Sequence, residues 1–294
     1  MKSLSAIAVL FLCQMCMGQA LKPIGTQGPV AGGVSPIFSA QQKIVVVVLE
    51  NTSYSEAISK PFFSQLAKSG ALFTNYHAIG HPSQPNYVAM IAGDKMGVSG
   101  DAPYDLEGAS LADLLEAKGK TWRVYAEDFP GRCYLGSTKG KYARKHVPFL
   151  SFKNIQGQPD RCANITDTAK FENDFKTGGL ANYNMYIPNL NNDGHDTGAA
   201  YADNFMAQTF SALLGDSKLM SDVLFVVTFD EDDNIFGGSN KIFTVLYGPM
   251  VKPGVEISTR YDHVSLLRTI EDGFQLGDLG RKDQTANPLT GFWQ

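Results

Sequence analysis

The chain alternates between short, uninterrupted apolar runs and longer segments with helical periodicity. The run Val45–Val48 has four consecutive valines, which is typical of a strand covered on both faces, as in a parallel sheet. Alternating strands and helices predict an α/β fold with a doubly wound, mainly parallel sheet and helices on both faces. We predict strands at 44–49, 71–76, 122–126, 183–187, 223–229 and 242–246, and helices at 61–69, 85–92, 110–118, 199–214 and 263–274.

Three polar clusters follow predicted strands. They are Glu50-Asn51, Asp193-Gly194-His195-Asp196 and Asp230-Glu231. Ligands of open α/β sheets bind beyond the carboxyl ends of the strands, so we expect the three clusters to converge. Taken alone, the acidic run that begins at Asp230 is more often a solvated turn. Its place after an apolar strand favours the crevice.

A fourth segment, His81-Pro82-Ser83-Gln84-Pro85-Asn86, supplies a hydroxyl group. Pro85 is typical of a first helical turn, so we expect Ser83 at or just before a helix start. Free N–H groups and the helix dipole favour an anion there, either a bound phosphate or the developing alkoxide of the serine. Asn86 could donate its amide to a phosphoryl oxygen. The alternative is an ordinary N-cap serine.

A neutral serine hydroxyl needs a base or a metal ion to become a nucleophile. The polar clusters offer mostly oxygen ligands, which favour a divalent metal cation such as calcium, magnesium or manganese. Zinc stays open because His195 and His263 could turn inward. The candidate metal ligands are Glu50, Asn51, Asp193, Asp230 and Glu231.

Four of the five histidines lie in or next to these clusters. A histidine near the leaving oxygen could act as a general acid, and His195 and His263 are the catalytic candidates beside Ser83. Each histidine could equally be structural. The basic stretch 141–146 is either a solvated loop face or a rim that attracts an anionic substrate. The candidate substrate-binding residues are His77, His81, Asn86, Lys145, His146 and Asp196.

The N-terminal residues predict export. Lys2, an apolar run at 6–13 and small residues near Gly18 and Ala20 have the order of a signal peptide, here 1–20. The apolar run itself is too short to span a bilayer. Residues 21–294 would then form a single domain that is secreted, or periplasmic in a bacterium. Cys133 and Cys162 are expected to pair in that oxidising compartment, with two buried free thiols as the alternative. Asn164 begins a glycosylation sequon.

Composition narrows the class of protein. With 294 residues, 44% hydrophobic and 18% charged, the chain can bury one sizeable core. Its formal net charge is -4, and it has no long Lys/Arg run, so neither nucleic acid nor an anionic membrane surface is a predicted partner. The predicted partner is a small anionic phosphoester substrate. The oligomeric state stays open.

The Gly-, Lys- and Pro-rich stretch 129–168 is interpreted as a loop-like flap, braced by the disulfide.

Six motifs resemble the phosphoesterase family of secreted acid phosphatases and bacterial-type phospholipases C. They are Glu50-Asn51-Thr-Ser-Tyr54, Phe73-Thr-Asn-Tyr-His77, His81-Pro-Ser-Gln-Pro-Asn-Tyr87, Asp193-Gly-His-Asp196, Phe229-Asp-Glu231 and Asp262-His-Val-Ser-Leu-Leu-Arg268. The resemblance covers nearly the whole mature chain. This family is related to the alkaline phosphatase superfamily, which implies an alkaline-phosphatase-like α/β fold. It also implies Ser83 as nucleophile, next to a metal held by Glu50, Asn51, Asp230 and Glu231.

Two departures from the family pattern narrow the function. Phospholipase-like members usually have Gly-Gly after the Asp-Glu pair, where this chain has Asp232-Asp233, and two-zinc relatives carry histidine where Glu231 stands. The chain ends at Gln294, without room for the accessory domains of large phospholipases. We therefore expect an acid phosphatase that hydrolyses phosphomonoesters through a phosphoserine. The alternatives are a phospholipase C-type phosphodiesterase and a non-catalytic phosphate- or headgroup-binding protein, against which Ser83 speaks.

Overall fold

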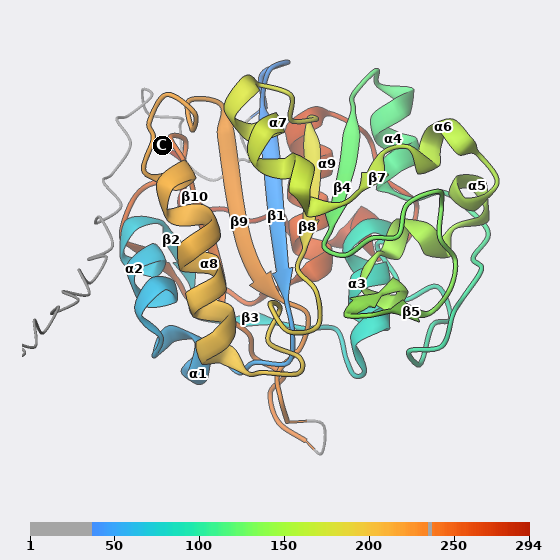
Figure 1. Ribbon diagram of the computed structural model, residues 1–294. Helices are drawn as coiled ribbons and strands as arrows, with labels where there is room; N and C mark the ends of the chain where they lie inside the picture. Colours follow the sequence, from blue (N-terminus) through green and yellow to red (C-terminus); the bar gives the residue numbers. More distant parts are fainter. Residues whose placement is uncertain (1–36, 235–236) are drawn as a thin grey trace, which may run out of the picture.

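An eight-stranded sheet forms the centre of the computed structural model, which describes residues 37–234 and 237–294 (Figure 1). The predicted signal peptide 1–20 lies outside the described residues. The strand order is β11-β2-β10-β9-β1-β8-β4-β7. The strands are β1 (Lys43–Leu49), β2 (Ala71–Phe73), β4 (Trp122–Ala126), β7 (Ile165–Thr166), β8 (Tyr183–Ile187), β9 (Val223–Phe229), β10 (Thr244–Tyr247) and β11 (Val255–Ile257).

The sheet is mainly parallel, as predicted. Strands β9, β1, β8, β4 and β7 run parallel to one another, whereas β10 is antiparallel to both of its neighbours. The valine run of β1 lies at the centre, and all four valines are at most 1% exposed. This burial on both faces explains why the strand carries no polar alternation.

Helices cover both faces of the sheet, which confirms the doubly wound prediction. In Figure 1, α7 and α8 lie over one face with α2 beside α8, and α3, α4 and α9 lie over the other. The longer helices are α1 (Tyr54–Ile58), α2 (Pro61–Ser69), α3 (Ser83–Ala92), α4 (Leu111–Ala117), α7 (Phe171–Thr177), α8 (Ala199–Leu214) and α9 (His263–Phe274). Two short ladders pair β3 (Tyr76–His77) with β12 (Tyr261–Asp262), and β5 (Thr138–Lys139) with β6 (Tyr142–Ala143).

The C-terminal segment closes the end of helix α3. Gly93 follows the helix with a φ of 70°, and a Cβ there would lie 2.5 Å from Oδ1 of Asp283. Arg281 Nη1 donates to the carbonyls of Ala92 at 2.8 Å and Ala109 at 3.0 Å. These contacts satisfy a helix carbonyl that has no partner inside α3.

The stretch 129–168 is a packed part of the molecule, so its interpretation as a loop-like flap was wrong. It contains β5, β6 and β7, with α5 (Lys153–Gln156) and α6 (Pro159–Cys162) between them. Phe149 and Phe152 are fully buried, and β7 pairs with β4 at the edge of the main sheet. Apolar side chains spaced along a Gly- and Pro-rich segment give no clear period, which is why the sequence suggested a loop.

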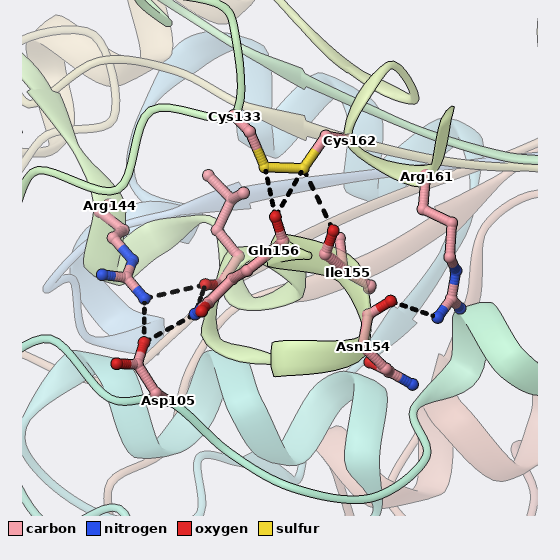
Figure 2. Close-up of a disulfide and its surroundings, with 9 residues drawn as sticks. Asp105, Cys133, Arg144, Asn154, Ile155, Gln156, Arg161 and Cys162 are labelled. Atoms are coloured by element: carbon pink, nitrogen blue, oxygen red, sulfur yellow. Dashed lines mark hydrogen bonds and ion pairs between the residues drawn. A yellow bond between two sulfur atoms is a disulfide. The ribbon is translucent and has the colours of Figure 1, made fainter. Parts of the chain in front are cut away.

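The predicted disulfide between Cys133 and Cys162 is confirmed (Figure 2). Its Cα atoms lie 5.4 Å apart, and the bridge lies against the carbonyls of Ile155 and Gln156 at the end of α5. Asn164 is partly exposed beside it, and its glycosylation stays a prediction. In the part of the chain that the structure describes, no helix has the length and apolar character needed to cross a membrane.

Candidate active site

The carboxyl ends of the central strands bring three buried acids together. Glu50 follows β1, Asp230 follows β9 and Asp193 lies in the loop after β8, and each of the three is fully buried. The backbone ties them to one another. The N–H of Glu50 donates to the carbonyl of Asp193 at 2.9 Å, and the N–H of Asp230 donates to Leu49 at 2.9 Å. The predicted convergence of the three polar clusters is therefore observed.

Ser83 points into this acidic cluster. It is the first residue of α3, with Pro82 as N-cap, and it is 2% exposed. Its Oγ donates to Oε2 of Glu50 at 2.9 Å. Pro85 lies in the first turn, where its missing N–H costs no intrahelical hydrogen bond. The serine is therefore not the N-cap of the helix, and its hydroxyl is aimed at a buried carboxyl group.

His146 lies between two of the acids. Its Nε2 is 3.1 Å from Oε1 of Glu50 and its Nδ1 is 3.5 Å from Oδ2 of Asp193, although the nearer contact lacks hydrogen-bond alignment. The ring stacks on Tyr87, with centroids 5.0 Å apart. Burial lowers the pKa of His146 to about 4, so the ring is neutral at physiological pH. The sequence placed this histidine on a substrate-attracting rim, whereas it is buried inside the acidic cluster.

Burial also dominates the acid–base properties of the carboxyl groups. It raises the pKa of Glu50 to about 8 and that of Asp193 to about 7, and the neighbouring Asp230 raises the pKa of Glu50 further. The pKa of Asp230 itself lies well above its usual range, because of burial and then Glu231. Several buried carboxyl groups that repel one another hold protons unless a cation compensates their charge.

These carboxyl groups offer oxygens that a cation could use. Oε1 of Glu50, Oδ2 of Asp193 and Oδ2 of Asp230 are buried without a hydrogen-bond partner in the described residues. Unpaired buried carboxyl oxygens fit a hard divalent cation. Nevertheless, the described residues, 37–234 and 237–294, contain no group of three or more His, Cys, Asp and Glu side chains that is already arranged to hold a metal ion.

Glu231 belongs to a neighbouring group. Its Oε2 lies 2.9 Å from Nδ1 of His81 and accepts from Nδ2 of Asn86 at 3.3 Å. Burial raises the pKa of Glu231 to about 8, with Glu50 as the next cause. The Asn86 side chain also bonds the backbone of residues 79, 80 and 82, so its amide holds the turn before Ser83 and is not free for a phosphoryl oxygen. Sequence spacing could not reveal that use.

Two of the predicted histidines make structural contacts. Nε2 of His263 hydrogen-bonds the carbonyl of Asp230 at 2.7 Å, and burial lowers its pKa to about 4. His77 uses Nδ1 on the carbonyl of Ser239 at 2.6 Å and Nε2 on Oδ1 of Asn75 at 2.8 Å. Both rings thus position backbone around the cluster. Both ring nitrogens of His77 are occupied, so neither is free for its predicted substrate-binding role. For its predicted catalytic role, His263 has one unpaired buried nitrogen, Nδ1.

His195 stands closer to solvent, at the rim of the cluster. Its backbone N–H donates to Oδ1 of Asp193 at 2.8 Å, and its ring is 2.8 Å from Oδ1 of Asp196. Lys141 pairs with the other oxygen of Asp196 at 2.8 Å. The ring is 32% exposed, which makes it accessible to a bound ligand.

Asn51 and Lys145 complete the set of predicted site residues. The backbone N–H of Asn51 donates to Oδ1 of Asp230 at 3.2 Å, and the residue has a φ of 45°, the left-handed region that asparagine tolerates. Lys145 Nζ lies 2.9 Å from Oδ2 of Asp101, a residue that the sequence did not single out. Tyr87 was also missed, although its position four residues after Ser83 places both on one helix face.

The sequence profile of the phosphoesterase family matches residues 54–277. The chain belongs to the phosphoesterase family. It is 35% identical to a probable acid phosphatase of Kluyveromyces lactis over 85% of this chain and 62% of that protein, and 35% identical to a phosphate-repressible acid phosphatase of Penicillium chrysogenum over 85% and 63%. The chain therefore spans less than two thirds of the length of these phosphoesterase relatives.

A bacterial relative is matched more fully. The chain is 35% identical to the phosphatidylinositol-3-phosphatase of Mycobacterium tuberculosis over 90% of this chain and 85% of that protein. Among solved structures, a protein of the alkaline phosphatase superfamily from Vibrio parahaemolyticus matches 88% of this chain and 73% of that chain, with a TM-score of 0.58 and 15% identity. This likeness confirms the alkaline-phosphatase-like fold.

Proposed function

We propose that this phosphoesterase is a secreted, metal-dependent acid phosphatase that hydrolyses phosphomonoesters through a phosphoserine at Ser83. The observation that carries the proposal is the 2.9 Å hydrogen bond from the Ser83 hydroxyl to the buried carboxyl group of Glu50. A serine held at a helix start and aimed at a buried acid is placed to attack an anionic phosphorus centre. The names of the acid phosphatase relatives support the same chemistry.

In the first half of the reaction, Oγ of Ser83 forms a bond to phosphorus while the bond from phosphorus to the leaving oxygen breaks. The ionised carboxylate of Glu50 orients Oγ and takes up its proton. The leaving oxygen needs a proton in return, and the exposed ring of His195 is the group that we assign to this step. In the second half, water forms a bond to phosphorus and gives a proton to His195, while the bond from phosphorus to Oγ breaks and Oγ recovers its proton from Glu50, which releases phosphate.

The ligands proposed for a divalent cation are Glu50, Asp193 and Asp230, whose unpaired buried oxygens fit one, with Asn51 and Glu231 beside them. A cation bound there supplies positive charge that stabilises the phosphoryl group and keeps the carboxylates ionised. Oxygen ligands favour calcium, magnesium or manganese, and zinc stays in the proposal because His146 adds an imidazole.

The substrate class that we assign is a phosphomonoester. The bacterial relative that the chain matches over most of its length is named a phosphatidylinositol-3-phosphatase, and the 3-phosphate of that lipid is a monoester. A phosphorylated lipid headgroup is therefore a substrate to assay beside small phosphomonoesters. A chromogenic phosphodiester is the comparison that would favour the phospholipase C alternative.

The deciding experiment replaces the nucleophile. Ser83→Ala should lower phosphomonoester turnover by at least about a thousandfold while the far-UV circular dichroism stays unchanged. Ser217→Ala is the matched control, because Ser217 is exposed in the loop between α8 and β9, at the opposite end of the sheet. A folded Ser83→Ala protein with near-normal turnover would exclude the phosphoserine route.

A further inference from the structure

Asp101 binds both the backbone N–H of the residue after Ser83 and the ammonium group of Lys145. Its Oδ1 accepts from the backbone N–H of Gln84 at 3.0 Å, and its Oδ2 lies 2.9 Å from Nζ of Lys145. Gln84 directly follows Ser83 in α3. The backbone N–H that follows a nucleophile is a common donor to the oxyanion formed on its substrate. In the free protein this donor is bound to a carboxylate of the chain itself.

The surroundings suit an anion. A cavity of about 130 Å³ opens beside Asp101, and its walls include Gln84, Lys145 and His195. Burial raises the pKa values of Glu50 and Asp193, and the charge of Lys145 opposes that effect on both. Lys145 is therefore a cation that lines the cavity and also acts on the acidic cluster.

We propose that Asp101 is an internal competitor of the substrate, a carboxylate that an anionic substrate must displace from Lys145 and from the N–H of Gln84. This inference rests on the proposed function, because it places the phosphoryl group beside Ser83. Asp101 can leave at small cost, since its side chain is 34% exposed and reaches solvent by moving outward. Any phosphoryl group that binds beside Ser83 has to break the same two contacts, so Asp101 weakens the binding of every anionic substrate at this site.

Two substitutions separate the two contacts of Asp101. Asp101→Asn keeps an oxygen for the N–H of Gln84 and removes the charge at Lys145, whereas Asp101→Ala removes both. We expect the KM for a chromogenic phosphomonoester to fall by about two- to fourfold in Asp101→Asn and by about three- to tenfold in Asp101→Ala, the range for releasing one ion pair and one charge-assisted hydrogen bond. The KM for the matching phosphodiester should fall by a similar factor, because the same two contacts are released for both substrates.

Orthophosphate binding, measured by calorimetry, gives a readout that needs no turnover. The Kd of orthophosphate should fall in Asp101→Asn and fall further in Asp101→Ala. The matched control is Glu107→Ala, because Glu107 lies in the same loop, is 79% exposed and, among the described residues, pairs only with the exposed Lys153. That control should leave both the KM and the Kd unchanged.

A double variant tests the route through Lys145. Lys145→Met should weaken orthophosphate binding, and in this background Asp101→Asn should have no further effect. An unchanged or higher orthophosphate Kd in Asp101→Ala would overturn the proposal, as would a loss of thermal stability with no change in that Kd. A wild-type protein that hydrolyses no phosphomonoester would reject the proposed function, whereas the orthophosphate series would still decide the role of Asp101.

Discussion

Glu271 makes the stability of the fold depend on pH. It lies in α9 and is fully buried, and neither of its carboxyl oxygens has a hydrogen-bond partner in the described residues. Burial, followed by the charge of Asp283, raises its pKa from 4.5 to about 9. Between these two values the folded chain holds a proton that the unfolded chain has released. The free energy of unfolding therefore falls as the pH rises through this window, by about 1.4 kcal/mol per unit.

Glu271→Gln removes this dependence, because a carboxamide stays neutral at every pH. The difference in unfolding free energy between Glu271→Gln and the wild type should shift in favour of the variant by about 3 kcal/mol between about pH 5.5 and pH 7.5, two units at the slope above. Because the test compares this free-energy difference at two pH values, any pH-independent cost of burying the carboxamide cancels. Urea unfolding followed by tryptophan fluorescence, with the disulfide intact, measures it.

The control is Glu172→Gln, an exposed glutamate of α7 that pairs with Lys176. The difference in unfolding free energy between Glu172→Gln and the wild type should stay constant across the same pH range. If the difference between Glu271→Gln and the wild type does not change with pH, then Glu271 is ionised in the folded protein and the argument from burial is refuted.

Three further predictions concern the site and its supports. Exhaustive chelation, or Asp230→Asn, should reduce phosphomonoester turnover strongly, and full activity in protein shown by elemental analysis to be metal-free would reject the cation site. Arg144→Met should lower the free energy of unfolding by about 3 kcal/mol or more, because the guanidinium bonds the carbonyls of residues 104, 135 and 150 at 2.8 to 3.0 Å; chemical denaturation checks this. Thiol titration of the denatured, unreduced protein should detect no thiol from Cys133 or Cys162, and reduction should cost about 3–4 kcal/mol of stability.

The middle of the central sheet could be predicted because its strands are mostly apolar, whereas the short edge strands β7 and β11 were not predicted. The predicted bounds of β4, β8, β9, α2, α8 and α9 agree with the structure at both ends. The segment predicted as one strand at 71–76 is instead divided between β2 and β3, which belong to different sheets. A local apolar pattern cannot tell which partner a strand will pair with.

The acidic centre was predictable for a topological reason. Residues that follow parallel strands must meet at one edge of the sheet, so Glu50 and Asp230 could be placed together although 180 positions apart in sequence. Arg144 and His146 were not predictable, because a run of basic residues usually stays in solvent, whereas both of these side chains are buried. The pairing of Asp101 with Lys145 joins two loops and leaves no trace in sequence spacing.

The contacts that close helix α3 matter for anyone who shortens or tags this protein. Arg281 and Asp283 hold the far end of the helix whose first residue is Ser83, although neither residue lies near the acidic cluster in sequence. Beyond them, Trp293 pairs with Val251 and stacks edge-on against Phe38. A deletion that begins before Arg281 would thus free the helix that carries the nucleophile, and crystallisation or fusion partners are better attached beyond Gln294 than in place of this tail.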